Sequence, residues 1–158
     1  IYAFFYIKKR FPTSKLFIIG KGSLENDLKK KVINLNLQHS IKFLGWLSKK
    51  KLNEILYQTQ FYLHFSKVDV IPNSIKEAMY SRCIVLSSKT FAIEEIIDHK
   101  KDGFIIDPKN KSKIVKIINF CINNTSSAKL IRNKARKKIK QNFDVKKNIK
   151  FFLRHFKY

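Results

Sequence analysis

Two acidic residues eight positions apart, Asp69 and Glu77, have the chemistry to contact a sugar nucleotide. They flank a Pro-Asn turn at 72–73, between an apolar run at 61–65 and an amphipathic segment at 74–81. A carboxylate can accept hydrogen bonds from sugar hydroxyls, and the unpaired N–H groups of a helix N-terminus suit a phosphate. A strand, a loop and a helix N-terminus with a carboxylate on either side therefore suit a sugar nucleotide. The competing interpretation is an ordinary strand–turn–helix with two solvated acids.

Alternating apolar runs and amphipathic segments must position these side chains. Strands that alternate with helices predict an α/β fold, a Rossmann-like doubly wound parallel sheet flanked by helices. Ligands bind such sheets beyond the carboxyl ends of the strands, where Gly20, Asp69 and Glu77 are expected to lie. The five runs of strand length are 15–19, 41–44, 61–65, 83–86 and 104–106.

A second loop of interest follows the first predicted strand. Gly20-Lys21-Gly22 lies between that strand and a helix that Ser23 is expected to cap. This order of strand, Gly-x-Gly and helix is the layout of a phosphate-binding loop. A lone Gly-x-Gly is common at strand–helix turns, so an ordinary tight turn is the competing interpretation.

The segment 69–79 resembles the carboxylate motif of retaining glycosyltransferases of group 1, or family 4. That motif is commonly written E-G-F-P-N-x-x-x-E-A-M, and this chain reads D-V-I-P-N-S-I-K-E-A-M. Three further segments are similar to the family: GKGSL at 20–24, IKFLG at 41–45 and EII at 95–97. In the segment 88–97, which ends with EII, the family's Gly-Gly pair is replaced by Phe91-Ala92.

The resemblance implies a role for each residue of the predicted site. Glu77 would hold the ribose of the donor, Asp69 the transferred sugar, and backbone amides near Ser74 and Ile75 the phosphate. The reaction would be the transfer of a hexose from a nucleoside-diphosphate sugar to a glycan or a lipid-linked acceptor, with retention of configuration, no metal and no further cofactor. Residues 69 and 77 are the catalytic candidates, and the donor-binding candidates are Gly20, Gly22, Pro72, Asn73, Ser74, Ile75 and Glu77.

The length of 158 residues predicts one domain, with basic helices at 128–158. The resemblance implies that this domain is the C-terminal, donor-binding half of a GT-B glycosyltransferase. The acceptor-binding half, a central strand of the sheet and an Arg-Lys pair that grips the diphosphate would then lie outside the chain. We therefore expect a fragment, or a partner of a second chain, that is inactive alone and lacks a sheet partner.

The charge balance leaves several partners open. There are 34 Lys and Arg residues against 11 acids, a formal net charge of +23. Compositional bias with solvated helix faces, an anionic membrane surface and nucleic acid all fit such a balance. Nucleic acid is the least favoured, because no aromatic and basic strand motif is present. No apolar run approaches the roughly 20 residues that span a bilayer, so a cytoplasmic protein, peripheral on the inner face of the membrane, is expected.

The runner-up function is a non-catalytic basic α/β module that binds a nucleotide or a nucleic acid. Two cysteines, Cys83 and Cys121, fall on a predicted strand and on an apolar helix stripe. They are expected to be buried free thiols, because neither has metal-ligand spacing to another Cys or His.

Overall fold

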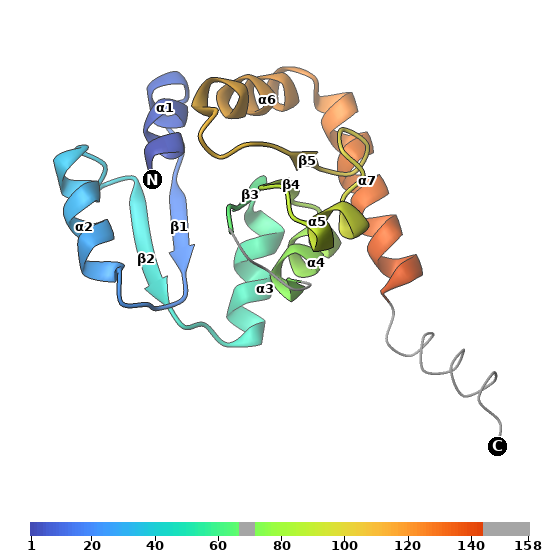
Figure 1. Cartoon of the computed structure of the whole chain (residues 1–158), viewed down its shortest axis with the longest axis horizontal. Helices are drawn as coiled ribbons and strands as arrows, with labels where there is room; N and C mark the ends of the chain where they lie inside the picture. Colours follow the sequence, from blue (N-terminus) through green and yellow to red (C-terminus); the bar gives the residue numbers. More distant parts are fainter. Residues whose placement is uncertain (67–71, 144–158) are drawn as a thin grey trace.

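The computed structural model describes residues 1–66 and 72–143 of the chain. Helices and strands alternate along these residues (Figure 1), which confirms the predicted α/β fold. The strands are β1 (Leu16–Ile19), β2 (Ile41–Gly45), β3 (Phe61–His64), β4 (Ile84–Ser87) and β5 (Phe104–Ile105). The helices are α1 (Tyr2–Arg10), α2 (Glu25–Asn34), α3 (Lys49–Gln58), α4 (Asn73–Tyr80), α5 (Phe91–Ile96), α6 (Lys111–Asn123) and α7 (Thr125–Asn142).

All pairings between these strands are parallel, but they form two sheets. β1 pairs with β2, with Leu16 opposite Ile41. β3 pairs with β4, with Phe61 opposite Ile84, and β4 pairs in turn with β5. Within residues 1–66 and 72–143, no strand connects β1 to β3. The single sheet expected from the five strands is therefore divided in two in this part of the chain.

The hydrophobic core has two parts, one on each face of β4. All four residues of β4 are buried. Ile84 and Leu86 pack in the cluster that contains residues of α1 and α6, whereas Val85 packs with residues of α4 and α5. Figure 1 shows these helix pairs on opposite sides of the second sheet. Burial on both faces explains why the strand sequence Ile-Val-Leu is continuously apolar and not alternating.

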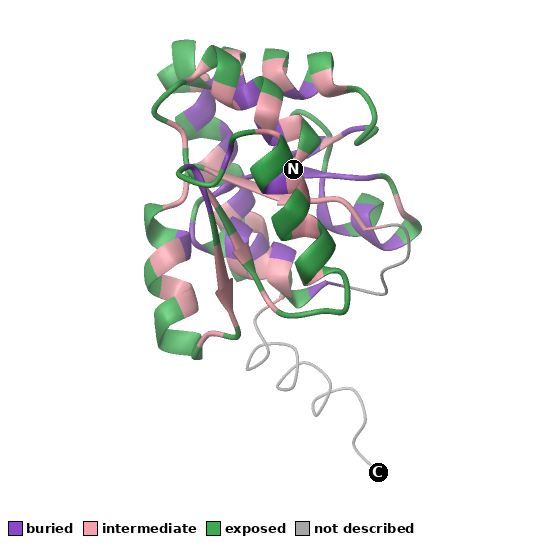
Figure 2. Cartoon of the chain, turned by 90° about the vertical axis from the view of Figure 1, so that its left-hand side faces the viewer, coloured by how far each residue is buried: buried purple, intermediate pink, exposed green. Residues whose placement is uncertain are grey.

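The long helix α7 joins the two parts of the core. Its buried residues are Ala128, Ile131, Ala135 and Ile139, of which the first two pack in one cluster and the last two in the other. In Figure 2 the buried residues of the helices lie on their inward faces and the exposed residues outward. Of the basic helices predicted at 128–158, the first begins three residues earlier, at Thr125, and residues 144–158 lie outside the described part of the chain.

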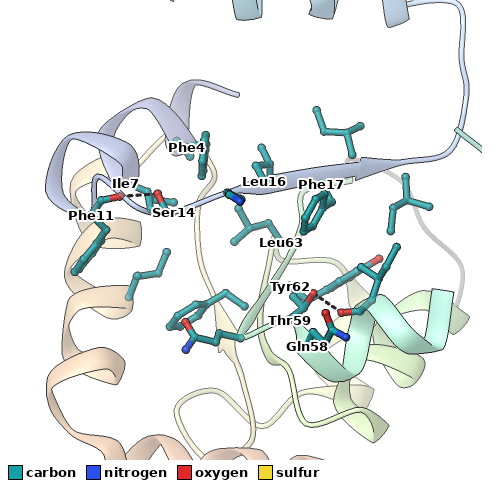
Figure 3. A pocket seen from close by; sticks show the side chains of 18 of the residues that line it. Phe4, Ile7, Phe11, Ser14, Leu16, Phe17, Gln58, Thr59, Tyr62 and Leu63 are labelled. Atoms are coloured by element: carbon teal, nitrogen blue, oxygen red, sulfur yellow. Dashed lines mark hydrogen bonds between the residues drawn. The ribbon is translucent and has the colours of Figure 1, made fainter. Parts of the chain in front are cut away.

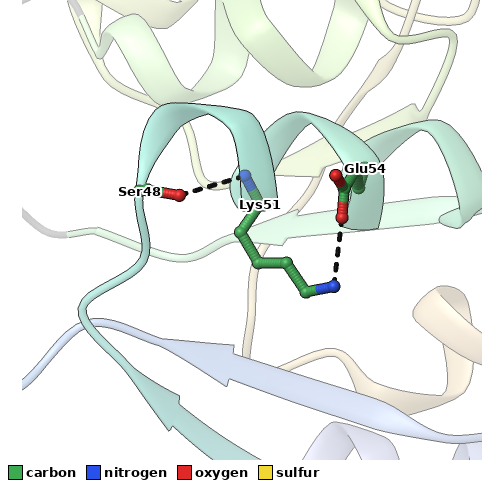
Figure 4. A network of polar contacts seen from close by, with 3 residues as sticks. All are labelled: Ser48, Lys51 and Glu54. Atoms are coloured by element: carbon green, nitrogen blue, oxygen red, sulfur yellow. Dashed lines mark hydrogen bonds and ion pairs between the residues drawn. The ribbon is translucent and has the colours of Figure 1, made fainter.

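Side-chain caps fix the start of several helices. The Ser48 hydroxyl accepts a hydrogen bond of 3.3 Å from the Lys51 N–H, and Lys51 forms an ion pair of 3.0 Å with Glu54 on the same helix (Figure 4). The predicted cap at Ser23 is wrong. The N-cap residue of α2 is Leu24, one position later, because the Glu25 N–H donates to the Gly22 carbonyl and closes a turn first.

No helix in the described part of the chain is both long enough and apolar enough to cross a bilayer.

Candidate functional site

The carboxyl ends of β1 and β2 are held together by two glycines. The Gly20 N–H donates to the Gly45 carbonyl at 2.8 Å. Gly20 has φ 109° and Gly45 has φ 62°, backbone conformations that residues with a Cβ rarely adopt. A Cβ at Gly20 or at Gly22 would meet no atom within 4 Å. The predicted glycine loop therefore borders open space, and it is the backbone conformation at Gly20 that requires glycine.

The predicted phosphate site lies at the start of α4. Pro72 is the N-cap residue, and no side chain caps the helix. The Ile75 N–H already donates to the Pro72 carbonyl at 3.2 Å, and its side chain is fully buried. The N–H groups of Asn73 and Ser74 have no hydrogen-bond acceptor among the described residues. These two amides, together with the partial positive charge of the helix N-terminus, are the groups that could meet an anion here.

Glu77 lies in the second turn of α4, with 28% of its side chain exposed. Its carboxylate forms an ion pair with the ammonium group of Lys49, the first residue of α3. Ile75, Ala78 and Met79 face the core, as predicted from their spacing, so Glu77 stands on the outer face of the helix. The carboxylate is therefore accessible to a ligand but already has a partner.

Lys49 connects the two halves of the site. Helix α3 follows β2 after three residues, so Lys49 comes four positions after Gly45, which binds Gly20. Lys49 could not be predicted as part of the site, because its place in the lysine run 49–51 indicated a solvated helix face. Two of the three lysines in that run form ion pairs, Lys49 with Glu77 and Lys51 with Glu54. The partner of Lys49 is 28 positions away, so local spacing carries no sign of the contact.

The loop that should carry Asp69 is anchored at its beginning. The Ser88 N–H donates to the His64 carbonyl at 3.0 Å, and the Ser88 hydroxyl donates to the Ser66 carbonyl at 2.5 Å. These bonds join the end of β4 to the end of β3. Asp69 itself lies in residues 67–71, outside the described part of the chain.

Neither cysteine belongs to the site. Cys83 and Cys121 are buried free thiols, as predicted. Burial raises the pKa of the Cys83 thiol to about 12, and its Sγ lies 3.3 Å from the Leu56 carbonyl oxygen. Among the described residues, no group of three or more His, Cys, Asp or Glu side chains is placed to hold a metal ion.

Curated relatives are glycosyltransferases of greater length. An uncharacterized glycosyltransferase of Haemophilus influenzae is 25% identical over 122 residues, which cover 75% of this chain and 33% of that protein. An uncharacterized glycosyltransferase of Methanocaldococcus jannaschii is 30% identical over 88 residues, or 56% of this chain and 21% of that protein. The chain thus spans a third or less of the length of these relatives.

Solved structures share the fold. The C-terminal domain of the group 1 glycosyl transferase LpcC from Francisella tularensis superposes with a TM-score of 0.80 at 20% identity, covering 90% of this chain and 76% of that one. Staphylococcus aureus TarM, in complex with UDP and other ligands, has a TM-score of 0.86 at 21% identity, covering 99% and 32%. Anabaena HepE in complex with UDP-glucose has a TM-score of 0.81 at 23% identity, covering 91% and 41%.

The family model described as glycosyl transferases group 1 matches residues 1–138. These residues include both glycine-loop positions, the first turn of α4 and Glu77. The chain belongs to the group 1 glycosyltransferase family and corresponds to its C-terminal domain.

Proposed function

We propose that this chain is the donor-binding part of a retaining hexosyltransferase. The full enzyme would move a sugar from a nucleoside-diphosphate sugar to a glycan or a lipid-linked acceptor. The observation that carries the proposal is the first half of α4, where two unpaired amides and an accessible carboxylate lie within five residues. The solved relatives in complex with UDP and UDP-glucose support a nucleotide sugar as the ligand.

Two kinds of contact would hold the donor, one to its phosphates and one to its sugar hydroxyls. The amides of Asn73 and Ser74 point along the axis of α4, where the helix dipole favours a phosphate oxygen. The Glu77 carboxylate would accept hydrogen bonds from two ribose hydroxyls. Asp69, in the loop between β3 and α4, would contact the transferred sugar, as the family motif implies.

Lys49 would change partners when the donor binds to Glu77. Its ammonium group keeps the Glu77 carboxylate paired when no donor is bound. The Lys49 side chain is 63% exposed and flexible, so the ion pair is weak and can open at little cost. When ribose hydroxyls reach Glu77, Lys49 can turn toward the nearby phosphates.

The charge on α7 supports a location at a membrane surface. This helix buries its apolar residues and exposes lysines along its outer side, namely Lys129, Lys134, Lys137 and Lys140. Such a row suits the anionic surface of a membrane, where each basic residue near the surface contributes about 1 kcal/mol. We propose that the protein is cytoplasmic and binds the inner leaflet peripherally.

The test compares the 158-residue chain with the protein extended by the acceptor-binding half. We expect the extended protein to release UDP or another nucleoside diphosphate from a panel of nucleotide sugars when acceptor glycans are added. The chain alone should bind the nucleotide, as seen by calorimetry, without turnover. Turnover by the chain alone would contradict the proposal that this chain binds the donor and needs the other half for transfer. Nucleotide binding without turnover in the extended protein would favour the runner-up, a binding module without transfer activity.

A further inference from the structure

Aromatic rings hold two lysines in place where α1 meets α2 and α6. The ammonium group of Lys31, in the last turn of α2, lies 4.7 Å from the centre of the Tyr2 ring. The ammonium group of Lys111, the first residue of α6, lies 5.2 Å from the same ring and 5.5 Å from the Tyr6 ring. The face of an aromatic ring attracts a cation without neutralising its charge. We call these four residues the tyrosine–lysine cluster.

The lysines of the tyrosine–lysine cluster keep their full charge. Within residues 1–66 and 72–143, neither Lys31 nor Lys111 forms an ion pair with a carboxylate. The lysines that do form ion pairs there are others, namely Lys29, Lys49, Lys51, Lys89 and Lys138. Because a ring and not a carboxylate positions each ammonium group of the cluster, both groups remain available to an anion from outside.

Further basic residues surround the tyrosine–lysine cluster, and acids are scarce. The sequence of α1 contains no Asp or Glu, and neither does the stretch 108–143, which includes α6 and α7. Lys9 is exposed on α1, and its ammonium group lies 4.5 Å from the centre of the Phe5 ring. We call the exposed side of α1 and α6, with the tyrosine–lysine cluster on it, the α1–α6 surface. It is strongly positive.

An open hollow lies on the α1–α6 surface. It is lined by Tyr6 and by residues near the start of α6, among them Lys109, Lys111 and Lys116. Asp107 is the only acid among the described residues that line the hollow, and its carboxylate accepts a hydrogen bond of 2.9 Å from the Lys109 N–H. Positive charge therefore predominates around the hollow.

A second cavity, between β1 and β3, has a different character. It has a volume of about 620 Å³, and side chains such as Phe17 and Leu63 point into it and make its walls apolar (Figure 3). An anion would lose its hydration there without gaining a cationic partner. The α1–α6 surface, and not this cavity, is therefore the place where an anionic partner would bind.

The α1–α6 surface lies away from the predicted donor site. In Figure 1, α1 and α6 occupy the upper part of the molecule, and the arrows of β1 and β2 point away from them. Gly20 and Gly45 lie at the ends of those arrows, and α3 begins with Lys49 beyond them. A partner on the α1–α6 surface would therefore leave the donor site open.

The tyrosines favour a membrane over a nucleic acid as the partner. Tyr2 and Tyr6 are 50% and 44% exposed, and lysines lie over both rings. Single-stranded nucleic acids stack their bases on open ring faces, and here the lysines compete for those faces. Tyrosine is enriched at membrane interfaces, where its ring meets the apolar boundary and its hydroxyl group stays in water. Lysines beside it attract anionic headgroups.

We propose that the α1–α6 surface binds the headgroups of anionic phospholipids, with Tyr2 and Tyr6 at the level of the headgroups and Lys31 and Lys111 paired with lipid phosphates. The proposal rests on the peripheral membrane location proposed above from the charge on α7, and it adds the surface that makes close contact with the lipid. Helix α6 leads directly into α7, so the lysines of α7 continue the same stretch without acids.

Vesicle binding by charge-matched variants tests the proposal. Lys31→Gln with Lys111→Gln removes two positive charges from the tyrosine–lysine cluster, and Lys21→Gln with Lys50→Gln removes two from exposed positions near the donor site. We expect the first pair to weaken cosedimentation of the chain with phosphatidylglycerol-containing vesicles about tenfold or more, and the second pair to weaken it about twofold or less. Equal losses for the two pairs would overturn the proposal.

A fluorescent label reports the contact directly. Ser112→Cys places a thiol in the hollow of the α1–α6 surface, and Leu24→Cys places one in the exposed loop before α2 as the control. Cys83 and Cys121 are buried, so a maleimide dye reaches the introduced thiol. With acidic vesicles present, quenching of the dye by iodide should fall about threefold or more at position 112 and stay unchanged at position 24.

The outcomes separate this inference from the membrane location itself. Vesicle binding that leaves the dye at position 112 open to iodide overturns the α1–α6 surface as the contact, while the location on the membrane stands. A chain that binds no acidic vesicles overturns both. Protection at position 112 by a single-stranded RNA oligomer, and not by vesicles, would assign the α1–α6 surface to a nucleic acid and overturn the proposal.

Discussion

At the scale of single residues, the site depends on how Glu77 is held. It stands on the outer face of α4, and its carboxylate is paired with Lys49 from α3. Gly45, whose carbonyl accepts from the Gly20 N–H where β1 and β2 end, lies only four positions before Lys49 in the chain. Lys49, at the start of α3, thus lies close in the chain to the glycine loop and contacts the carboxylate of Glu77 on α4.

Glu77→Gln tests the assigned role of the carboxylate. In the extended protein we expect kcat/KM for the nucleotide sugar to fall about 30- to 1000-fold, or about 2–4 kcal/mol. The amide keeps the shape of the side chain but loses the charge, and one of its two ends becomes a donor facing donors. Steady-state kinetics measures the change, with circular dichroism to confirm the fold.

Glu54→Gln is the matched control for this experiment. It removes the carboxylate of another exposed Lys-Glu pair, which Lys51 and Glu54 form within α3 itself. Its kcat/KM should stay within about twofold of the unmodified protein, as is usual for a surface substitution worth less than 0.5 kcal/mol. Equal efficiencies for the two variants would remove Glu77 from the donor site.

Cys83 provides a second prediction at this scale. Because burial raises the pKa of its thiol to about 12, almost no reactive thiolate exists at neutral pH. Iodoacetamide at about pH 8 should leave Cys83 unmodified in the folded chain and alkylate it after unfolding in urea. Mass spectrometry of the two samples measures this, and rapid alkylation of the folded chain would show that the strand end opens to solvent.

At the scale of elements, α7 is attached to the rest of the fold by a buried carboxylate. Asp102 lies in the loop between α5 and β5 with only 3% of its surface exposed. It accepts a hydrogen bond of 2.8 Å from the Asp98 N–H and forms an ion pair with Lys138 of α7 at 3.3 Å. Burial raises the pKa of Asp102 above its ordinary value, and the ammonium group of Lys138 opposes that rise.

Lys138→Ala should therefore destabilise the chain in a manner that depends on pH. A raised carboxyl pKa in the folded state means that stability is greatest while Asp102 is protonated and falls as pH rises through that pKa. Without Lys138 the pKa of Asp102 rises further, so the loss of unfolding free energy should reach about 1–3 kcal/mol near pH 7. The loss should shrink as pH falls toward 3.8, the ordinary value.

Urea denaturation at several pH values measures this difference. Lys137→Ala, which removes the neighbouring exposed lysine, is the control and should change the free energy of unfolding by less than about 0.5 kcal/mol at every pH. A loss for Lys138→Ala that is constant with pH would show that Asp102 does not respond to the lysine.

At the scale of the whole molecule, the net charge of +23 requires an anionic partner or a purely compositional origin. If α7 meets a membrane, the chain should bind vesicles that contain acidic phospholipid, and the binding should fall steeply between about 50 mM and about 300 mM salt. Cosedimentation measures the bound fraction. Equal binding to neutral phosphatidylcholine vesicles would argue against an electrostatic membrane contact.

A pair of variants separates α7 from the remaining charge. Lys134→Gln with Lys137→Gln lowers the charge of α7, and Lys100→Gln with Lys101→Gln lowers the total charge equally in an exposed loop. We expect the first pair to weaken vesicle binding about tenfold or more and the second to weaken it little, at about 1 kcal/mol for each contacting lysine. Equal losses would mean that charge alone, and not this helix, sets the binding.

The elements and the buried face of α4 could be predicted from the sequence. Periods of two and 3.6 residues depend on near neighbours, so the apolar run before Gly45, the buried Ile-Val-Leu of β4 and the inward residues of α4 could all be predicted. The same local spacing placed Glu77 on the outer face of its helix. Helix starts were less certain, because Ser23 competed with a backbone turn that supplied the hydrogen bond first.

Contacts between distant residues can be found only in the folded structure. Glu77 lies 28 positions from Lys49, and Asp102 lies 36 positions from Lys138, since 138 minus 102 is 36. No periodicity relates such pairs, because their meeting depends on the path of the whole chain. The cavity between β1 and β3 has the same origin: the sequence shows where the two strands are, but only their positions in space show that residues of both line one apolar cavity.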